Sequence, residues 1–368
     1  MSEQEIYSLR PSRFSNWWYQ KKNAFYASEW VQDVSARIPF LSRVSRNEGA
    51  AIFQLMSGFV DTQILLVFVR SGALAHLRDA PKTVPQFAAL IGLKIESAHI
   101  LCRAGHALGL VKLKGDKVSI ARRGVLVLTL PGISELIDHH SVLYSDLEDP
   151  IAFFNDQSDR RLAHFWPYVF GAKNGVDETD VSRYSALMTK SQRMVAHDTL
   201  DAIKLPKSCN WLDVGGGSGA FVTEVLRRQR SINASVFDLP GSNTGSQGHA
   251  FIPGSFFDDE LPSGFDVISL VRVLYDHSDD SITKLLTKIY NALPQNGRLI
   301  VSEPMLGQGA PNRWGDTYFA IYTLAMNTGK TRSATEITDI MRKIGFSEIK
   351  IHRSKRPYVT QVIECWKK

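Results

Sequence analysis

The chain has 368 residues, of which 44% are hydrophobic and 22% are charged. This length predicts two domains, and this composition excludes a chain that is disordered throughout. The formal net charge of +6 permits an anionic partner, but no long run of Lys or Arg indicates nucleic acid.

The N-terminal residues 1–45 are rich in aromatic side chains, and residues 50–70 carry apolar side chains at helical spacing. No run reaches the roughly 18 consecutive apolar residues typical of a membrane span, so we expect no transmembrane helix. The aromatic run at 17–19 stands beside Lys21 and Lys22 and suits a membrane interface. An arm packed on a partner subunit is the preferred interpretation of the same run.

A compact pattern follows over residues 73–123. Helices are predicted over 84–91, with Thr83 as N-cap, and over 96–108. Leu110 to Leu113 and Lys117 to Ile120 then form a β-hairpin. Helix, turn, helix and hairpin is the pattern of a winged helix. The second helix carries little that could read bases or hold phosphates, so we expect dimerisation rather than DNA binding.

Strands and helices alternate through the last part of the chain, which predicts a doubly wound α/β domain. Its last two strands lie close enough in sequence to form an antiparallel hairpin. We place a helical, winged-helix domain at residues 1–150 and the α/β domain at residues 151–368. The predicted strands are Asn210–Val214, Ala234–Leu239, Val267–Val271, Arg298–Glu303, Ile349–His352 and Val359–Trp366.

The clearest chemical signal lies between the first of these strands and its helix, where Asp213 precedes glycines spaced as GxGxG. A dinucleotide loop instead follows GxGxxG and cradles a pyrophosphate, which an acid at 213 would repel. The acid suits a ligand with an ammonium group, such as S-adenosylmethionine (SAM). Asp238 ends the next strand, where an acid accepts hydrogen bonds from ribose hydroxyls. The signal therefore predicts a SAM site, with a tight ligand-free turn as the alternative.

At these residues the chain resembles the class I SAM-dependent O-methyltransferases that carry an N-terminal winged-helix dimerisation domain. The resemblance extends over nearly the whole chain. It implies S-adenosyl-L-methionine as cofactor, S-adenosyl-L-homocysteine as product, and a homodimer. The sparse cysteines separately indicate a reducing cytoplasm. Further motifs that fit the family are Phe237-Asp238-Leu239-Pro240, Pro253-Gly254-Ser255-Phe256-Phe257, Val271 to His277 and Leu299 to Pro304.

Within that family the chain is particularly similar to the carotenoid enzymes of purple photosynthetic bacteria, the demethylspheroidene or hydroxyneurosporene O-methyltransferases. This implies methylation of the tertiary 1-hydroxyl of an acyclic carotenoid. The alternatives are methylation of another hydrophobic phenol or of a bacteriochlorophyll-type tetrapyrrole and, from another class, a winged-helix regulator that senses SAM. The phrases that carry the similarity are Asp138 to Tyr144, Phe165 to Gly171, Leu270 to His277 and Gly315 to Ala320.

The resemblance also implies a set of cofactor-binding residues. Many relatives have Asp-Met where this chain has Ser255-Phe256, so one carboxylate contact to the adenine is missing here. The segment 239–254 is rich in Gly and Ser and is expected to form a loop where relatives have a helix. The implied residues are Asp213, Gly215, Gly216, Gly217, Asp238, Leu239, Ser255, Phe256 and Arg272.

The identity of the catalytic base is left open, because phenol-methylating relatives have histidine where this chain has Tyr275. His277 could act as the base, Tyr275 could orient the alcohol without a strong base, or His277 could serve only a structural role. Asp276 and Glu303 could orient an imidazole, or each could be a strand-end acid satisfied by backbone amides.

The remaining candidates are residues of the substrate pocket wall, for most of which ordinary core packing is equally plausible. We expect no metal site, because Asp276, His277, Asp279 and Asp280 fit the acidic start of a helix better. Three sparse cysteines also argue against a zinc site and a disulfide framework. The pocket candidates are His139, His140, Trp166, Tyr168, Met188, Tyr318, Tyr322 and Asn327.

Overall fold

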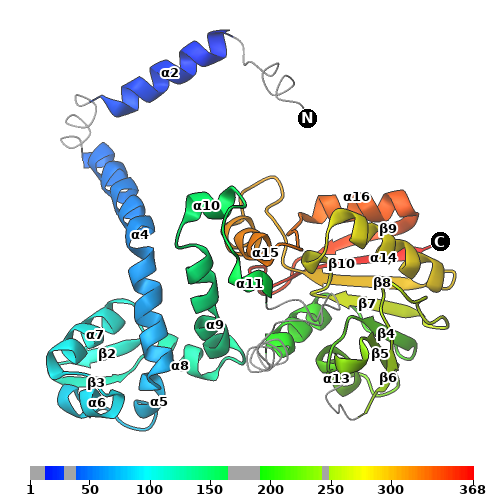
Figure 1. The fold of residues 1–368 in the computed structure, drawn as a ribbon, viewed down its shortest axis with the longest axis horizontal. Coiled ribbons are helices and arrows are strands. Elements are labelled where there is room, and N and C mark those ends of the chain that lie inside the picture. The colour runs from blue at the N-terminus through cyan, green and yellow to red at the C-terminus, as the bar shows by residue number, and fades with distance from the viewer. Residues whose placement is uncertain (1–12, 29–38, 165–190, 243–247) are drawn as a thin grey trace. The chain divides into compact units, whose positions relative to one another are not determined.

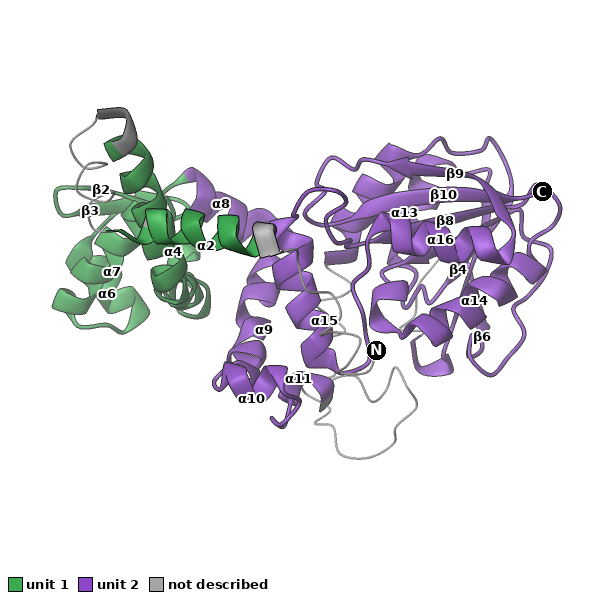
Figure 2. Ribbon diagram, turned by 90° about the horizontal axis from the view of Figure 1, so that it is seen from above, with its two compact units in different colours: residues 1–121 green, residues 122–368 purple. Residues whose placement is uncertain are grey.

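The computed structural model describes residues 13–28, 39–164, 191–242 and 248–368 (Figure 1). The chain forms two compact units, residues 1–121 and 122–368 (Figure 2). The sequence placed this boundary at residue 150 instead. Helix α9 (Ile133–Asp146) packs against α11 (Arg161–His164) and α15 (Ala320–Met326), and these contacts join it to the second unit.

The first unit begins with α2 (Arg13–Ala27) and the long helix α4 (Pro39–Arg70), which starts before the predicted residue 50. Among the described residues, α4 is the one helix long and apolar enough to cross a membrane, over Ser42–Arg70. This differs from the expectation of no such helix, because polar residues interrupt its apolar runs. A helix that packs on a protein partner can have the same length and composition.

The predicted helix-turn-helix and hairpin are confirmed as α6 (Val84–Ile91), α7 (Ile95–Ala107), β2 (Val111–Lys114) and β3 (Lys117–Ile120). A two-residue strand, β1 (Lys82–Thr83), adds to the hairpin and gives the strand order β1-β3-β2. Thr83 caps α6 in a capping box with Gln86, as the sequence predicted for the cap. Gly105 lets α7 approach α4, because a Cβ there would lie 2.5 Å from the ring of Phe68.

The second unit is built on a seven-stranded sheet with the order β6-β5-β4-β7-β8-β10-β9. Strand β10 is antiparallel to both β8 and β9, whereas the remaining pairs are parallel, so the predicted doubly wound fold with its antiparallel hairpin is confirmed. The strands are β4 (Asn210–Val214), β5 (Asn233–Asp238), β6 (Ala250–Pro253), β7 (Val267–Val271), β8 (Arg298–Glu303), β9 (Phe346–His352) and β10 (Gln361–Lys367).

Apolar residues on these strands alternate between two buried clusters, as the two-residue period of a strand requires. Ile268 and Leu270 of β7 pack with α14 (Asp279–Ala292) and α16 (Ala334–Ile344). Val267 and Val271 pack instead with α13 (Ala220–Arg228) and the helical residues 191–202. Helices therefore cover both faces of the sheet, and the carboxyl ends of the parallel strands are left to form a binding edge.

The segment 239–254 contains more structure than the predicted loop. A short 3-10 helix spans Pro240–Ser242, and β6 pairs in parallel with β5 at the sheet edge. Strand β6 is short and only partly buried, so it lacks the apolar run that marks an internal strand. Its Pro253 is tolerated because the strand lies at the edge.

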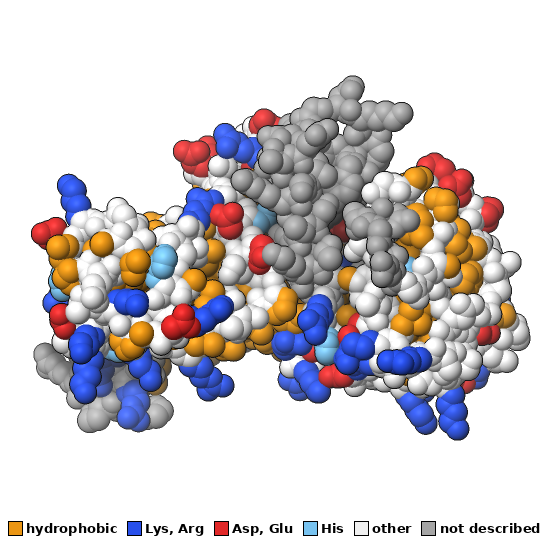
Figure 3. Space-filling model, turned by 90° about the horizontal axis from the view of Figure 1, so that it is seen from below, with side chains coloured by type: hydrophobic (Ala, Val, Ile, Leu, Met, Phe, Trp, Pro, Cys, Tyr) orange, Lys and Arg blue, Asp and Glu red, His pale blue; other side chains and the backbone are white. Residues whose placement is uncertain are grey.

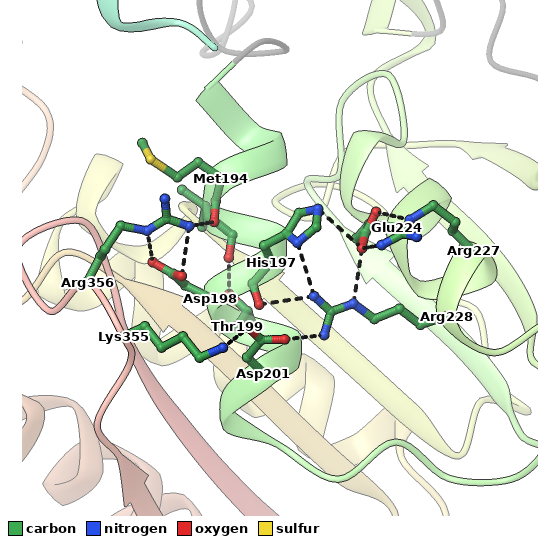
Figure 4. Close-up of polar contacts among 11 residues, drawn as sticks. Met194, His197, Asp198, Thr199, Asp201, Glu224, Arg227, Arg228, Lys355 and Arg356 are labelled. Carbon is green, nitrogen blue, oxygen red and sulfur yellow. Dashed lines mark hydrogen bonds and ion pairs between the residues drawn. The ribbon is translucent and has the colours of Figure 1, made fainter. Parts of the chain in front are cut away.

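Ion pairs fix the helical residues 191–202 to other parts of the second unit (Figure 4). Asp198 pairs with Arg356 at 2.8 Å, and Asp201 pairs with Arg228 at 2.6 Å. Arg228 also reaches Glu224 of its own helix at 3.0 Å. These contacts join the helix to α13 and to the β9–β10 loop, and they hold its first turn near the end of β7.

Candidate active site

The glycine loop between β4 and α13 adopts backbone conformations that residues with a Cβ atom rarely adopt. Gly215 and Gly217 have φ angles of 71° and 55°, in the left-handed region that favours glycine. At Gly216 the restriction is steric instead, because a Cβ would lie 2.5 Å from Oδ2 of Asp213. The Gly217 N–H donates to Oδ2 of Asp238 at 2.7 Å, so loop and acid form one unit.

Asp213 is a buried carboxyl with an unused acceptor. Its Oδ1 accepts a hydrogen bond from the Ser269 hydroxyl at 2.5 Å, and Ser269 in turn accepts one from the Trp211 ring nitrogen at 2.9 Å. Its Oδ2 has no hydrogen-bond partner in the described part of the chain. Burial, followed by a smaller effect of the Asp238 charge, raises the pKa of Asp213 to about 7. A cationic ligand would stabilise the ionised form.

Asp238 is already engaged by the protein. Its Oδ1 accepts from the Leu239 N–H at 2.6 Å and from the Ser242 hydroxyl at 2.8 Å. Each carboxylate oxygen has about two acceptor positions, so Oδ2, which receives only Gly217, can still accept one donor. The carboxylate is therefore held in place for a further hydroxyl.

Ser255 and Phe256 follow β6. The Ser255 hydroxyl donates to Asp258 at 2.9 Å, and the Ser255 N–H donates to Asp259 at 2.8 Å. The carboxylate that relatives carry at position 255 is thus absent, but Asp258 brings one next to it. The Phe256 ring lies 4.6 Å from the Phe257 ring between centroids.

His277 packs against this aromatic pair. Its ring meets Phe256 at 5.4 Å and Phe257 at 5.1 Å between centroids, both edge-on. Burial, helped by the nearby Arg332 charge, lowers the pKa of His277 to about 4, so its ring is neutral near pH 7. The His277 carbonyl accepts a hydrogen bond from Arg332 at 2.8 Å. The rings of His277, Phe256 and Phe257 thus form one packed aromatic cluster.

Tyr275 and Asp276 lie in a buried 3-10 turn, η2 (Leu274–Asp276), directly after β7. Burial raises the pKa of both groups above their usual values, and the Arg272 guanidinium opposes that shift in each. Arg272 has a φ of 61°, a strained backbone for a non-glycine residue, and its Nη1 donates to the Ser191 hydroxyl at 2.9 Å.

Glu303 ends β8 and completes this buried group. Its Oε1 accepts from the N–H groups of Val273 and Leu274 at 2.8 and 2.9 Å. Its Oε2, like Oδ1 of Asp276, has no hydrogen-bond partner in the described residues. Burial raises the pKa of Glu303 to about 7, and its charge raises that of Asp276. Two buried carboxyl groups, those of Asp276 and Glu303, thus lie near the Arg272 guanidinium.

The pocket candidates divide into three groups. His139, His140, Tyr318 and Tyr322 come together, since His140 Nε2 lies 2.8 Å from Tyr318 Oη and His139 Nε2 lies 2.9 Å from Tyr322 Oη. Asn327 caps α15 with a φ of 63°, and its amide oxygen accepts from Arg160 at 3.0 Å. The third group, Trp166, Tyr168 and Met188, lies outside the described residues.

Sequence reasoning missed Ser191, Phe257 and Ser269. Ser269 carried a usable signal, because it is the one hydroxyl inside the apolar strand Val267–Val271, and a buried hydroxyl needs a partner. Phe257 and Ser191 carried none, since their roles depend on contacts across the fold. In the described ranges, no group of three or more His, Cys, Asp or Glu is arranged to hold a metal ion.

Comparisons with known proteins agree with this geometry. A family model described as an O-methyltransferase domain matches residues 144–347. The chain is 44% identical to a demethylspheroidene O-methyltransferase of Rhodobacter capsulatus, over 92% of this chain and 87% of that protein. It is 43% identical to the protein of that name from Cereibacter sphaeroides, over 91% of this chain and 92% of that protein.

Solved structures share the fold. Human N-acetylserotonin methyltransferase in complex with SAM has a TM-score of 0.73 at 20% identity, covering 87% of this chain and 97% of that chain. The pyocyanin biosynthetic protein PhzM has a TM-score of 0.72 at 18% identity, covering 88% and 99%. On the family model and the close relatives, the chain belongs to the O-methyltransferase family.

Proposed function

We propose that this O-methyltransferase transfers the methyl group of SAM to the tertiary 1-hydroxyl of an acyclic carotenoid of the demethylspheroidene or hydroxyneurosporene type. The observation that carries the cofactor is the unpartnered Oδ2 of buried Asp213 beside the glycine loop. The observation that carries the substrate class is the similarity to two demethylspheroidene O-methyltransferases along nearly the whole chain.

The cofactor assignment rests on how the residues fit the molecule. Bound SAM supplies a methyl group already activated on a sulfonium. Asp213 offers its open oxygen to the ammonium group, and Gly215 to Gly217 let the backbone approach closely. Asp238, with Leu239 beside it, offers one open acceptor position to the ribose. Ser255, Phe256 and the neighbouring aromatic rings form the adenine wall.

The roles of the catalytic candidates follow from their surroundings. The packing of His277 on two phenylalanines supports a structural role at the adenine wall rather than a base. The burial of Tyr275 beside the Arg272 charge supports Tyr275 as a group that orients the alcohol. Asp276 and Glu303 offset the charge of Arg272, and the burial of this group excludes water from the reacting hydroxyl.

We propose that the first unit, residues 1–121, mediates dimerisation and that the second unit, residues 122–368, is the methyltransferase domain. Five apolar residues of α4, namely Ile52, Phe53, Leu55, Met56 and Phe59, are between 62% and 71% exposed. An apolar helix face of this kind needs a partner, and a second copy supplies an identical one. Phe59→Glu should convert a dimer to a monomer in multi-angle light scattering, whereas Glu48→Ala should not.

Two finer proposals concern location and surface. The three cysteines are free, which suits a cytoplasmic enzyme. Trp17, Trp18 and Tyr19 on α2 are between 51% and 65% exposed, and an arm packed on the partner subunit explains them without a membrane. Vesicle flotation that depends on these three residues would instead support peripheral membrane contact.

The DNA-binding regulator gains no support from the surface. The face drawn in Figure 3 mixes Lys and Arg side chains with acidic and apolar ones. Helix α7, which would read bases in a winged helix, exposes the apolar Ile100 at 70%.

The deciding experiment is a methyl-transfer assay with labelled SAM. Detergent-dispersed 1-hydroxy carotenoid would be compared with phenols, catechols and a tetrapyrrole. Label in the carotenoid alone is expected. Label in a phenol or tetrapyrrole would leave the fold and family intact and overturn the substrate. SAM binding without any transfer would overturn the enzymatic proposal in favour of a sensor.

A further inference from the structure

Two histidine–tyrosine pairs join α9 to the segment that follows β8. His140 Nε2 lies 2.8 Å from Tyr318 Oη, and His139 Nε2 lies 2.9 Å from Tyr322 Oη. Tyr318 lies in η3 (Trp314–Phe319), a π-helical stretch that continues into α15, and π-helical turns are frequent at functional sites. The two tyrosine rings are 6.0 Å apart between centroids.

Both pairs lie beside the buried acids at the end of β7. Helix α15 packs against η2. The Arg272 charge acts on Tyr318 and Tyr322 as well as on Tyr275, so the three phenols share one environment. The alcohol that receives the methyl group belongs at this place, because ligands of such sheets bind at the carboxyl ends of the strands.

The two tyrosines differ in access, whereas His139 and His140 are both partly buried. Tyr322 is 7% exposed and forms part of a core cluster with Leu143, Phe153 and Met326, as expected for a structural contact. His140 and Tyr318 are only partly buried, and Tyr318 lies at the margin of that cluster. The His140–Tyr318 pair can therefore meet a substrate, and the His139–Tyr322 pair provides a matched comparison.

We propose that the His140–Tyr318 pair accepts the proton of the substrate hydroxyl, the task for which phenol-methylating relatives have a histidine at the position of Tyr275. This inference rests on the proposed function. The substrate hydroxyl donates to Tyr318 Oη, and the Tyr318 hydroxyl donates to Nε2 of neutral His140. A tyrosine alone is a poor acceptor, but a tyrosine that passes its own proton to an imidazole is a better one.

The step balances as follows. The bond between substrate oxygen and methyl carbon forms as the bond between methyl carbon and sulfur breaks. The substrate proton moves to Tyr318 Oη, and the phenol proton of Tyr318 moves to Nε2 of His140. The products are the methyl ether, S-adenosyl-L-homocysteine and an imidazolium, which then releases its proton to solvent.

Titratable and charged groups face the pair from three elements. His139 and Tyr144 face His140 from α9, Tyr318 faces it from η3, and Arg272 acts on Tyr318 from the end of β7. Burial, followed by the charge of His139, lowers the pKa of His140 to about 4. The imidazole is thus neutral at pH 7 and can accept a proton, but as a weak base that releases the proton readily to solvent.

The test compares variants of the two pairs in the full-length enzyme. His140→Gln and Tyr318→Phe are each expected to lower kcat about 100-fold or more, with the Kd for SAM changed less than about twofold. The double variant should be no slower than the worse single variant, because the two groups act as a unit. Tyr322→Phe, which removes the hydroxyl of the structural pair, should lower kcat less than about fivefold.

A second readout distinguishes proton transfer from packing. Wild-type kcat should show a solvent isotope effect and an acid limb near the His140 pKa, and both should disappear in His140→Gln. The ring of His140, followed by NMR, should titrate at a different pH in Tyr318→Phe. A folded His140→Gln enzyme that keeps kcat, isotope effect and acid limb would overturn the inference. If wild-type enzyme methylates no carotenoid, the proposed function fails instead.

If His140→Gln does not fold, Tyr318→Phe decides the matter. It removes a single oxygen, and retention of wild-type kcat and isotope effect in that variant would overturn the inference.

Discussion

The proposed cofactor side and the proposed acceptor side of this site are built in different ways. On the cofactor side, Asp213, the glycine loop and Asp238 lie within 26 residues of sequence, and the backbone N–H groups of Gly217 and Leu239 hold Asp238. On the acceptor side, side chain meets side chain across 178 and 183 residues of sequence. The comparison teaches that the family's shared cofactor is encoded locally, whereas the acceptor is selected by contacts between distant segments.

The largest expected effect would break the cofactor side alone. Asp238→Ala removes the acceptor for the ribose and the anchor of the Gly217 N–H. Two lost hydrogen bonds to a charged group should raise the Kd for SAM about 100-fold or more, measured by calorimetry. Ser242→Ala is the matched control, since it removes one donor to Asp238 but leaves the carboxylate. Equal effects from both variants would contradict this role of Asp238.

A pH experiment would sharpen the comparison through stability. The pKa values of Asp213 and Glu303 are raised to about 7 in the folded chain, above their unfolded values of about 4. Their contribution to stability is therefore fully present below about pH 4 and is lost as pH rises through about 7. The ligand-free enzyme should lose about 2–3 kcal/mol of stability from each of these two groups between pH 5 and pH 8, measured by denaturant unfolding.

The two acids should respond differently to SAM. Asp213→Asn and Glu303→Gln should each flatten this pH dependence. Saturating SAM should remove the contribution of Asp213 to the pH dependence of stability, because the ammonium group stabilises its carboxylate. The contribution of Glu303 should remain. A pH slope that is the same in wild-type and Asp213→Asn enzyme would contradict the account of Asp213.

The smallest expected effect concerns the aromatic wall. Phe257→Leu keeps the apolar character of the site but removes the edge-on contact with His277. The Kd for SAM should rise about five- to tenfold, since an aromatic pair contributes about 0.5–1.5 kcal/mol beyond its area. The methylation rate at saturating SAM should stay within about twofold. A large loss of rate at saturating SAM would show that His277 takes part in the chemistry after all.

The sequence predicted the architecture of the second unit well. Strands β4, β7 and β8 have the predicted bounds, because buried parallel strands are continuous apolar runs that glycines and acids interrupt at their ends. The edge strand β6 was missed, since a half-exposed strand of four residues lacks that pattern. The boundary at residue 150 differs from the observed division after Ala121, because α9 packs on helices that come much later in the chain.

The site itself was predictable only in part. The glycine loop and its two acids could be identified because neighbours in sequence are neighbours in space there. The position of His277 against Phe256 and Phe257 could not, because it depends on how the turn after β7 faces the end of β6. The pairing of α9 histidines with later tyrosines was likewise invisible, although each residue had been named as a pocket candidate.

The most direct test of the division between the two sides is calorimetric titration of SAM into wild-type, Asp238→Ala and His140→Gln enzyme, with turnover measured on the same samples. We predict that Asp238→Ala loses SAM affinity, whereas His140→Gln binds SAM as wild-type does and turns over about 100-fold more slowly. Loss of SAM affinity in His140→Gln to the same degree as in Asp238→Ala would contradict the division and with it the proton path.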